Sequence, residues 1–209
     1  MNNLRTYLLY FLILVYVSGS IGFVLNPGFF LPFTPYTLLL TTLAFLMYQP
    51  MGQRRFLVAF VASACLGFAL EVAGVKTGVV FGHYYYGEAL GIKLFGVPLT
   101  IALNWALLIS AGAAIGHRIS SNKWLVALLC ASGILGIDLL MEQVAAAYDF
   151  WHFENGMAGL RNYVAWFVIT FVLCVLFHKG FKMAEQKISG WVLLLQCMFF
   201  GTLVIIKYF

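Results

Sequence analysis

Apolar runs of membrane-spanning length recur along this chain, and they constrain its fold more than any other feature. Candidate spans cover residues 7–25, 31–48, 56–75, 97–116, 124–147, 160–177 and 191–206. A helix needs about 20 mostly apolar residues to cross the hydrocarbon core of a bilayer, and 63% of the 209 residues are hydrophobic. The sequence therefore predicts one integral membrane domain over residues 1–209, an all-α polytopic bundle of about seven transmembrane helices. The span at 31–48 is interrupted by Pro32 and Pro35, and the last two spans are short.

The basic residues predict an orientation for this bundle. Of the twelve Lys and Arg residues, eight fall at one set of helix ends. These are Arg5, Arg54, Arg55, Arg118, Lys123, Lys179, Lys182 and Lys187, whereas Lys76, Lys93, Arg161 and Lys207 fall at the other. The positive-inside rule then places the N-terminus in the cytoplasm and the C-terminus outside a bacterial or archaeal cytoplasmic membrane. The net charge of +5 has the same origin, because these loop residues face anionic membrane lipids. No nucleic-acid partner is indicated.

Six of the seven carboxylates lie in two short stretches, 71–88 and 138–154, at the predicted outer ends of the helices. They are Glu71, Glu88, Asp138, Glu142, Asp149 and Glu154, whereas Glu185 is expected to be a solvated charge among cytoplasmic lysines. An ionisable group in or beside hydrocarbon is costly, and only 9% of the residues are charged. The clustering therefore points to a functional site, with proton chemistry as the leading candidate.

Asp138 and Glu142 are four residues apart and project from one face of a helix. Two carboxyl groups one turn apart in a poor dielectric cannot both ionise cheaply, so one is expected to keep its proton and to serve as a general acid. The alternative is structural: either residue could pair with Arg161, Lys76 or Asn104 and lock the bundle. We favour catalysis.

Two long aromatic loops, 76–98 and 147–163, are expected to fold back onto the bundle as re-entrant or interfacial segments. Glycines in the first loop are expected to break any regular helix or strand. The consecutive Tyr84, Tyr85 and Tyr86 fit either an interfacial aromatic belt or a binding site, and the sequence leaves both open.

The two loops also follow equivalent helices. A glutamate lies near the end of each preceding helix (Glu71 and Glu142), and a tryptophan occupies the same place in each return helix (Trp105 and Trp166). This pattern suggests a degenerate helix–loop–helix repeat that would place two carboxylates around one pocket. His83 and His152 lie in the loops, but no His-x-x-x-His or His-x-x-Glu spacing occurs on a helix, so no metal site is expected.

Two sequence motifs resemble a known family. The first is Glu71-x2-Gly-Val-x-Thr-Gly-x2-Phe-Gly-x-Tyr-Tyr-Tyr86, followed by Leu90-Gly91, Gly96-Val-Pro-Leu99 and Asn104-Trp105. The second is Asp138-x3-Glu142, Asp149-x-Trp151 and Asn162-Tyr-x-x-Trp166. Together, over about residues 56–178, they are similar to the integral-membrane carotenoid biosynthesis family, which includes carotenoid 1,2-hydratases such as the gamma-carotene and bisanhydrobacterioruberin hydratases.

This resemblance implies hydration of the terminal C1–C2 double bond of a linear carotenoid, an isoprenoid polyene, without a cofactor. A proton added to the less substituted carbon would leave a tertiary carbocation for water to capture. Asp138 or Glu142 would donate the proton, and Glu71 or Asp149 would hold the water. The substrate would be bound by Tyr84, Tyr85, Tyr86, Trp105, Trp151 and Trp166, with Asn104 and Asn162 orienting polar groups.

Three other functions fit the same residues. A proton-coupled membrane transporter could use the carboxylates as a relay. A carotenoid cyclase or isomerase would share the protonation step and quench the cation without water. A non-catalytic carotenoid-binding subunit would need the aromatic groove but not the acids. The sequence does not indicate an oligomeric state.

Overall fold

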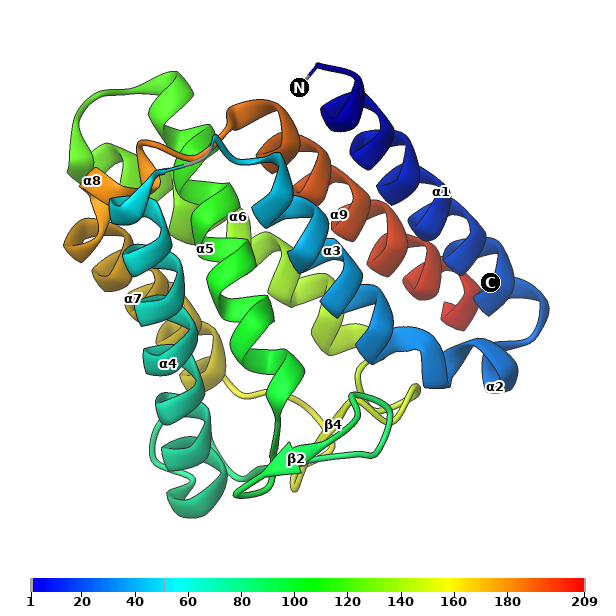
Figure 1. Cartoon of the computed structure of the whole chain (residues 1–209). Helices are drawn as coiled ribbons and strands as arrows, with labels where there is room; N and C mark the ends of the chain where they lie inside the picture. The colour runs from blue at the N-terminus through cyan, green and yellow to red at the C-terminus, as the bar shows by residue number, and fades with distance from the viewer. Residues whose placement is uncertain (1, 51, 209) are drawn as a thin grey trace.

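The computed structural model describes residues 2–50 and 52–208 and shows a bundle of apolar helices closed at one end by two loops (Figure 1). The long helices are α1 (Asn2–Leu25), α3 (Thr34–Tyr48), α4 (Arg54–Thr77), α5 (Leu99–Ile119), α6 (Lys123–Val144), α7 (Leu160–Leu176) and α9 (Gln186–Tyr208). Six helical segments of the described chain are long and apolar enough to cross a membrane, and α7, with 17 residues, is a shorter apolar helix. The predicted polytopic α-helical membrane bundle is therefore confirmed.

Short elements join these helices. They are α2 (Pro27–Phe30), the 3-10 turn η1 (Leu31–Phe33), α8 (His178–Phe181), and the strands β1 (Tyr84–Tyr86), β2 (Lys93–Leu94), β3 (Val97–Pro98) and β4 (Trp151–Phe153). The prolines of the second span do interrupt it: each of α2, η1 and α3 begins with a proline in its first turn, where the missing N–H costs nothing. The last helix was expected to be short, and this is wrong. It has 23 residues, because its polar first turn extends the helix beyond the apolar run.

Helix α5 is the centre of the bundle. In the most apolar window of each span, 72% of α5 is buried, against 22–44% for the other spans. Small residues let its neighbours approach closely: a Cβ added at Gly112 would lie 2.8 Å from the Cys130 sulfur, and one added at Gly116 would lie 3.0 Å from Val126, both on α6. The outer helices expose large apolar side chains, such as Leu14, Leu43 and Val61, as lipid-facing surfaces do.

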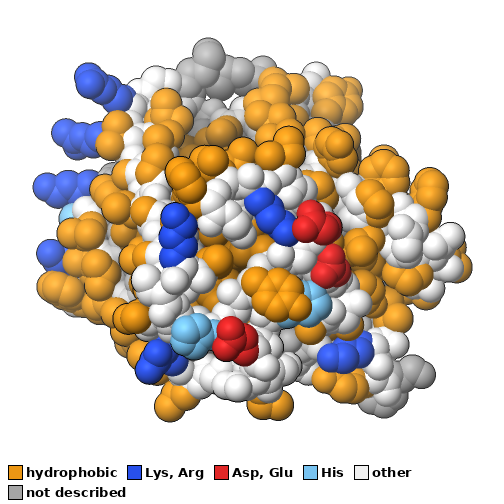
Figure 2. Space-filling model, turned by 90° about the horizontal axis from the view of Figure 1, so that it is seen from below, with side chains coloured by type: hydrophobic (Ala, Val, Ile, Leu, Met, Phe, Trp, Pro, Cys, Tyr) orange, Lys and Arg blue, Asp and Glu red, His pale blue; other side chains and the backbone are white. Residues whose placement is uncertain are grey.

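The two loops meet at one end of the bundle and pair with each other. β1 and β4 form an antiparallel pair in the register Tyr84↔Phe153, Tyr85↔His152 and Tyr86↔Trp151. The expectation that the glycines exclude strands is therefore wrong. Gly78 and Gly82, both with positive φ, make the turns before β1 and leave the three tyrosines free to extend. Figure 2 views this end and shows acidic, basic and histidine side chains scattered among apolar ones.

Candidate functional site

A small recess lies beneath the paired loops, and Glu71 and Glu142 both line it. The other lining residues are Phe81, Tyr84, Tyr86, Ile101, Asn104, Met141, Trp151, Phe153, Asn162 and Trp166. Its volume of about 20 Å³ is enough for one water molecule. Helices α4 and α6 thus bring their carboxylates to a single aromatic pocket, as the predicted repeat requires.

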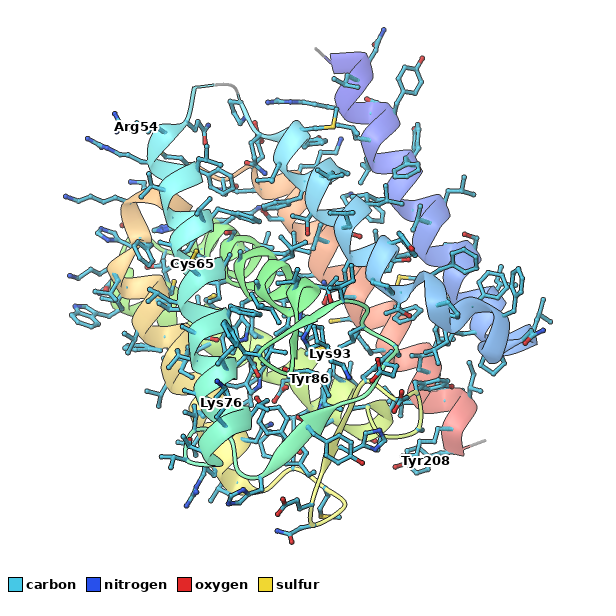
Figure 3. All side chains as sticks on the ribbon, turned by 60° about the horizontal axis from the view of Figure 1, so that its bottom comes forward. Arg54, Cys65, Lys76, Tyr86, Lys93 and Tyr208 are labelled. Atoms are coloured by element: carbon cyan, nitrogen blue, oxygen red, sulfur yellow. The ribbon has the colours of Figure 1, made fainter. Side chains whose placement is uncertain are left out.

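Glu71 is 2% exposed and accepts three hydrogen bonds. The hydroxyls of Tyr84 and Tyr86 donate to its Oε2, the second at 2.8 Å, and the Trp105 indole N–H donates to its Oε1 at 2.9 Å. Burial, and then the neighbouring Glu71 charge, raise the pKa of both tyrosines, so their hydroxyls stay protonated. In Figure 3 the labelled Tyr86 lies at the loop end of the bundle, far from Arg54. Three hydrogen-bond donors therefore fix the orientation of the Glu71 carboxylate, which acts as the acceptor for all of them.

Two glycines make room for the rings around Glu71. Gly67 and Gly74 lie one turn before and one turn after it on α4. A Cβ at Gly67 would come 2.7 Å from the Trp105 Cβ, and one at Gly74 would come 2.6 Å from the Phe81 ring. Because these two positions lack side chains, Trp105 and Phe81 can pack directly against α4 on either side of Glu71.

We expect Gly67→Ala to destabilise the protein by about 1–3 kcal/mol, because the added methyl group overlaps the base of Trp105 and overpacking has roughly that cost. The matched control is Gly133→Ala on α6, where an added Cβ meets nothing within 4 Å. Thermal unfolding in detergent measures both variants. Equal melting temperatures for the two would contradict the close fit of Trp105 on α4.

Glu142 and Asp138 share one partner. The Asn162 amide of α7 donates to Glu142 Oε1 at 3.0 Å and, more weakly, to Asp138 Oδ2 at 3.4 Å. The Trp151 indole N–H donates to Glu142 Oε2 at 3.1 Å. Asp138 is fully buried, its Oδ1 has no hydrogen-bond partner among the described residues, and it does not line the recess. Glu142 therefore faces the recess, and Asp138 lies behind it.

The cationic partners that the structural alternative named for this pair, Arg161 and Lys76, lie elsewhere. Arg161 donates to the Gly78 carbonyl at 3.4 Å, and the Lys76 amine lies over the Phe95 ring at 5.0 Å. The ion pairs found among residues 2–50 and 52–208 join Arg5 to Glu185, Lys93 to Glu88 and His152 to Asp149. Glu71, Asp138 and Glu142 thus lack a cationic partner within the described chain, and Glu185 is paired rather than simply solvated.

The predicted aromatic residues, apart from Tyr85, lie at the recess or next to it. Tyr84, Tyr86, Trp151 and Trp166 line the recess. Trp105 stacks face to face on Trp166, with ring centroids 3.9 Å apart and planes 8° apart. β1 also pairs antiparallel with β4, with Tyr85 opposite His152. Both the strand pair and the tryptophan pair join corresponding residues of the two repeat halves, as expected if an approximate twofold axis relates these halves. The two asparagines, Asn104 and Asn162, line the recess as well.

Tyr85 and Asp149 are not brought to the recess. Tyr85 is 58% exposed and stacks on the His152 ring at 5.1 Å, which suits an interfacial position. Asp149 adopts a positive φ of 52° and joins the two loops. Its Oδ2 accepts the Glu88 backbone N–H at 2.7 Å, and its Oδ1 lies 2.8 Å from His152 Nε2. These contacts, the one with His152 first, lower the pKa of Asp149.

We expect Asp149→Ala to loosen the loops without removing a reacting group. The variant loses the Glu88 and His152 contacts, so the loops should be cleaved faster by added protease while the helices stay intact. In the unmodified chain this stabilisation is present above the unfolded pKa of an aspartate and is lost as the pH falls through the lower folded pKa. Unchanged loop cleavage in Asp149→Ala would contradict a clamping role. Glu154→Ala is the control, since Glu154 is an exposed acid in the same loop.

Two features of the site were not predicted from the sequence. Gly67 has a signal in hindsight, because it precedes Glu71 by one turn and Gly74 follows on the same face of α4. The second feature is an apolar cavity beside the recess, built largely by α1, α3 and α9. In the described part of the chain, no group of three or more His, Cys, Asp and Glu side chains is placed to hold a metal ion.

Comparison with known proteins identifies the family. The family model described as "Carotenoid biosynthesis protein" matches residues 33–208. A curated relative, bisanhydrobacterioruberin hydratase of Haloarcula japonica, is 30% identical over 173 residues. The match covers 75% of this chain and 58% of the relative, so the chain spans less than two thirds of that protein's length. No solved structure matches the chain. By the extent of the family match, this chain is a member of the carotenoid biosynthesis protein family.

Proposed function

We propose that this protein hydrates the terminal C1–C2 double bond of a linear carotenoid. The observation that carries the proposal is the convergence of Glu71 and Glu142 on one aromatic recess with room for a single water molecule. Family membership and a relative named as a hydratase support the same reaction class.

Glu142 is the proposed proton donor. It transfers its proton to the less substituted alkene carbon, the C=C π electrons form the new C–H bond, and a tertiary carbocation remains. The faces of Trp166, Trp151 and Tyr86, which border the recess, stabilise that cation. Water then forms the C–O bond, and its excess proton passes to Glu71, which is already oriented by three donors. Return of this proton from Glu71 to Glu142 completes the cycle, so the net reaction adds one water.

Asp138 acts as a positioning residue in this scheme. The Asn162 amide links it to Glu142 by hydrogen bonds, and one of its oxygens has no partner among the described residues. A buried carboxyl group with an unpartnered oxygen is less costly to keep protonated than ionised. When Asp138 is neutral, the Asn162 amide can keep its shorter hydrogen bond to Glu142. A charged Asp138 would instead repel the carboxylate that Glu142 becomes when it gives up its proton.

A cyclase or isomerase would use the same proton donor, so the fate of the cation separates these functions. The experiment is expression in cells that accumulate lycopene or gamma-carotene, with mass spectrometry of the extracted pigments. We expect a product heavier by one water. The Asp138→Asn, Glu142→Gln double variant should give none, and normal hydration by it would remove the pair from the mechanism. An isomeric product of unchanged mass would instead support cyclisation or isomerisation.

We also propose that the loop end faces outward and the N-terminus lies in the cytoplasm. Arg54, Arg55, Lys123 and Lys179 border one groove at the end opposite the loops, in keeping with the positive-inside rule. Alkaline phosphatase, which is active only outside the cytoplasm, should be active when fused after α9 and inactive when fused before α1. The reverse pattern would invert the assigned orientation.

A further inference from the structure

A larger cavity adjoins the recess on the side of α1, α3 and α9. It encloses about 360 Å³, and its wall is mainly apolar, with Phe23, Phe29, Phe30, Phe33, Phe199 and Phe200 among its residues. Four residues line both spaces: Ile101, Asn104, Met141 and Trp151. The cavity therefore adjoins the recess that Glu71 and Glu142 line, with these four residues at their common boundary, and its size is that of a small-ligand pocket.

The cavity reaches the outer surface of the bundle near α1 and α3, because residues of both helices that line it are exposed or half-buried. Ser18 on α1 is exposed, and Thr34 and Thr37 on α3 are half-buried, yet all three line the cavity. An apolar molecule dissolved in the bilayer could enter the cavity on this side without crossing the loops.

One buried amide in this apolar wall has a polar neighbour but no hydrogen bond of ordinary geometry. Gln196, in the middle of α9, is 2% exposed, and neither its Nε2 nor its Oε1 reaches a hydrogen-bond partner at ordinary geometry among the described residues. It lies beside the Tyr16 hydroxyl, which accepts a hydrogen bond from Thr41 Oγ1 at 3.4 Å. An amide whose hydrogen bonds are incomplete is costly inside a membrane bundle, and a polar side chain at such a depth is a candidate for a binding or transport site.

Gln196 also lies at a different depth from the carboxylates. Lys207, about three turns further along α9, donates to the carbonyl of Gln143, the neighbour of Glu142. Three helical turns correspond to roughly 16 Å. A ligand that fills the cavity would thus place one part at the recess and another, well removed from it, against Gln196.

We propose that this cavity binds the polyene segment next to the reacting end, and that Gln196 and Tyr16 bind an oxygen substituent, a hydroxyl or a carbonyl, on that segment. The inference rests on the proposed function for the identity of the ligand as a polyene. It adds that the substrate carries an oxygen remote from the double bond that reacts. The amide nitrogen can donate to either kind of oxygen, whereas only a hydroxyl can also donate to the amide oxygen, so a hydroxyl can satisfy both polar atoms of Gln196.

The first test fills the cavity. An added Cβ at Gly19, which lines the cavity, meets nothing within 4 Å, so Gly19→Trp can place its ring in the open space. Gly133→Trp is the matched control, at an exposed position of α6 where an added Cβ also meets nothing within 4 Å. We expect purified Gly19→Trp to retain at least tenfold less carotenoid than the unmodified protein and Gly133→Trp to retain a normal amount. Equal retention by both variants would overturn the assignment of the cavity.

The second test concerns the oxygen. Binding of a hydroxylated polyene and of the hydrocarbon of equal length is measured by the absorbance shift of each pigment on titration into the purified protein. The unmodified protein should bind the hydroxylated form roughly tenfold more tightly, as one well-placed hydrogen bond provides, and Gln196→Leu should remove that difference. A preference that survives in Gln196→Leu, or no preference in the unmodified protein, would overturn the role of Gln196.

Both tests measure binding, so their outcome is separate from that of the proposed reaction. A protein that binds the hydroxylated polyene through Gln196 but adds no water would contradict the hydratase proposal and leave this site in place. Hydration that proceeds equally well in Gly19→Trp and in the unmodified protein would contradict this site and leave the hydratase proposal in place.

Discussion

Replacing Glu142 by Gln should abolish hydration while the protein still folds and inserts. The side chain keeps its shape and one acceptor oxygen for Trp151 or Asn162, but it can no longer supply a proton to the alkene. Loss of a general acid lowers a rate by about 10²–10⁴-fold. The measurement is the ratio of hydrated to unhydrated carotenoid, at equal protein level in the membrane fraction.

The control for Glu142→Gln is Glu154→Gln, the same change at an exposed acid in the adjoining loop. It should leave the product ratio unaltered. If Glu142→Gln forms product at the normal rate, proton donation belongs to another group, and the assignment of Glu142 fails even if hydration itself is confirmed.

Replacing Glu71 by Leu should have the largest effect on stability. The change strands the hydroxyls of Tyr84 and Tyr86 and the indole N–H of Trp105, which all donate to this carboxylate. Each buried donor left without a partner costs about 1–3 kcal/mol. We expect a lower melting temperature in detergent and loss of the carotenoid product.

Glu88→Leu provides the control for Glu71→Leu. It is the same substitution at the same end of the bundle, but Glu88 is exposed, and its ion pair with Lys93 at 2.7 Å is a surface contact of little worth. A Glu71→Leu protein as stable as Glu88→Leu would show that the three donors do not depend on Glu71. Glu71→Gln, which keeps one acceptor oxygen, should fall between the two in stability.

The bundle and the pairing of the carboxylates were predictable from the sequence because both depend on local pattern. Apolar runs fix the spans, and the matched positions of Glu71 and Glu142 before each loop, and of Trp105 and Trp166 after it, anticipated one shared recess. Asp138 was correctly placed beside Glu142 by its spacing of one helical turn.

The roles of the loop residues were not predictable in the same way. Tyr84 and Tyr86 face the recess and Tyr85 faces outward because residues alternate along a strand, and that strand exists only because 151–153 pairs with it. Asp149 lies on the loop side of the same pairing, so it clamps the loops and does not line the recess.

The cavity depends on contacts that no local pattern reveals. Its walls come from α1, α3 and α9, mostly outside the residues that carry the family motifs. Gln196 was visible as a single amide within an apolar span, which is a signal for function inside a membrane. Its position beside Tyr16, in the wall of the cavity, depends on how α1 and α9 pack and could not be predicted from the sequence.

The measurement that tests the central claim most directly is isotope incorporation by the purified protein. An acyclic carotenoid is incubated with it in deuterated water, and in a separate reaction in water enriched in oxygen-18. Protonation by a buried carboxyl group and capture of water predict one carbon-bound deuterium next to a tertiary alcohol whose oxygen comes from the solvent. A product that gains no solvent oxygen, or that carries oxygen but no carbon-bound deuterium, would contradict the mechanism.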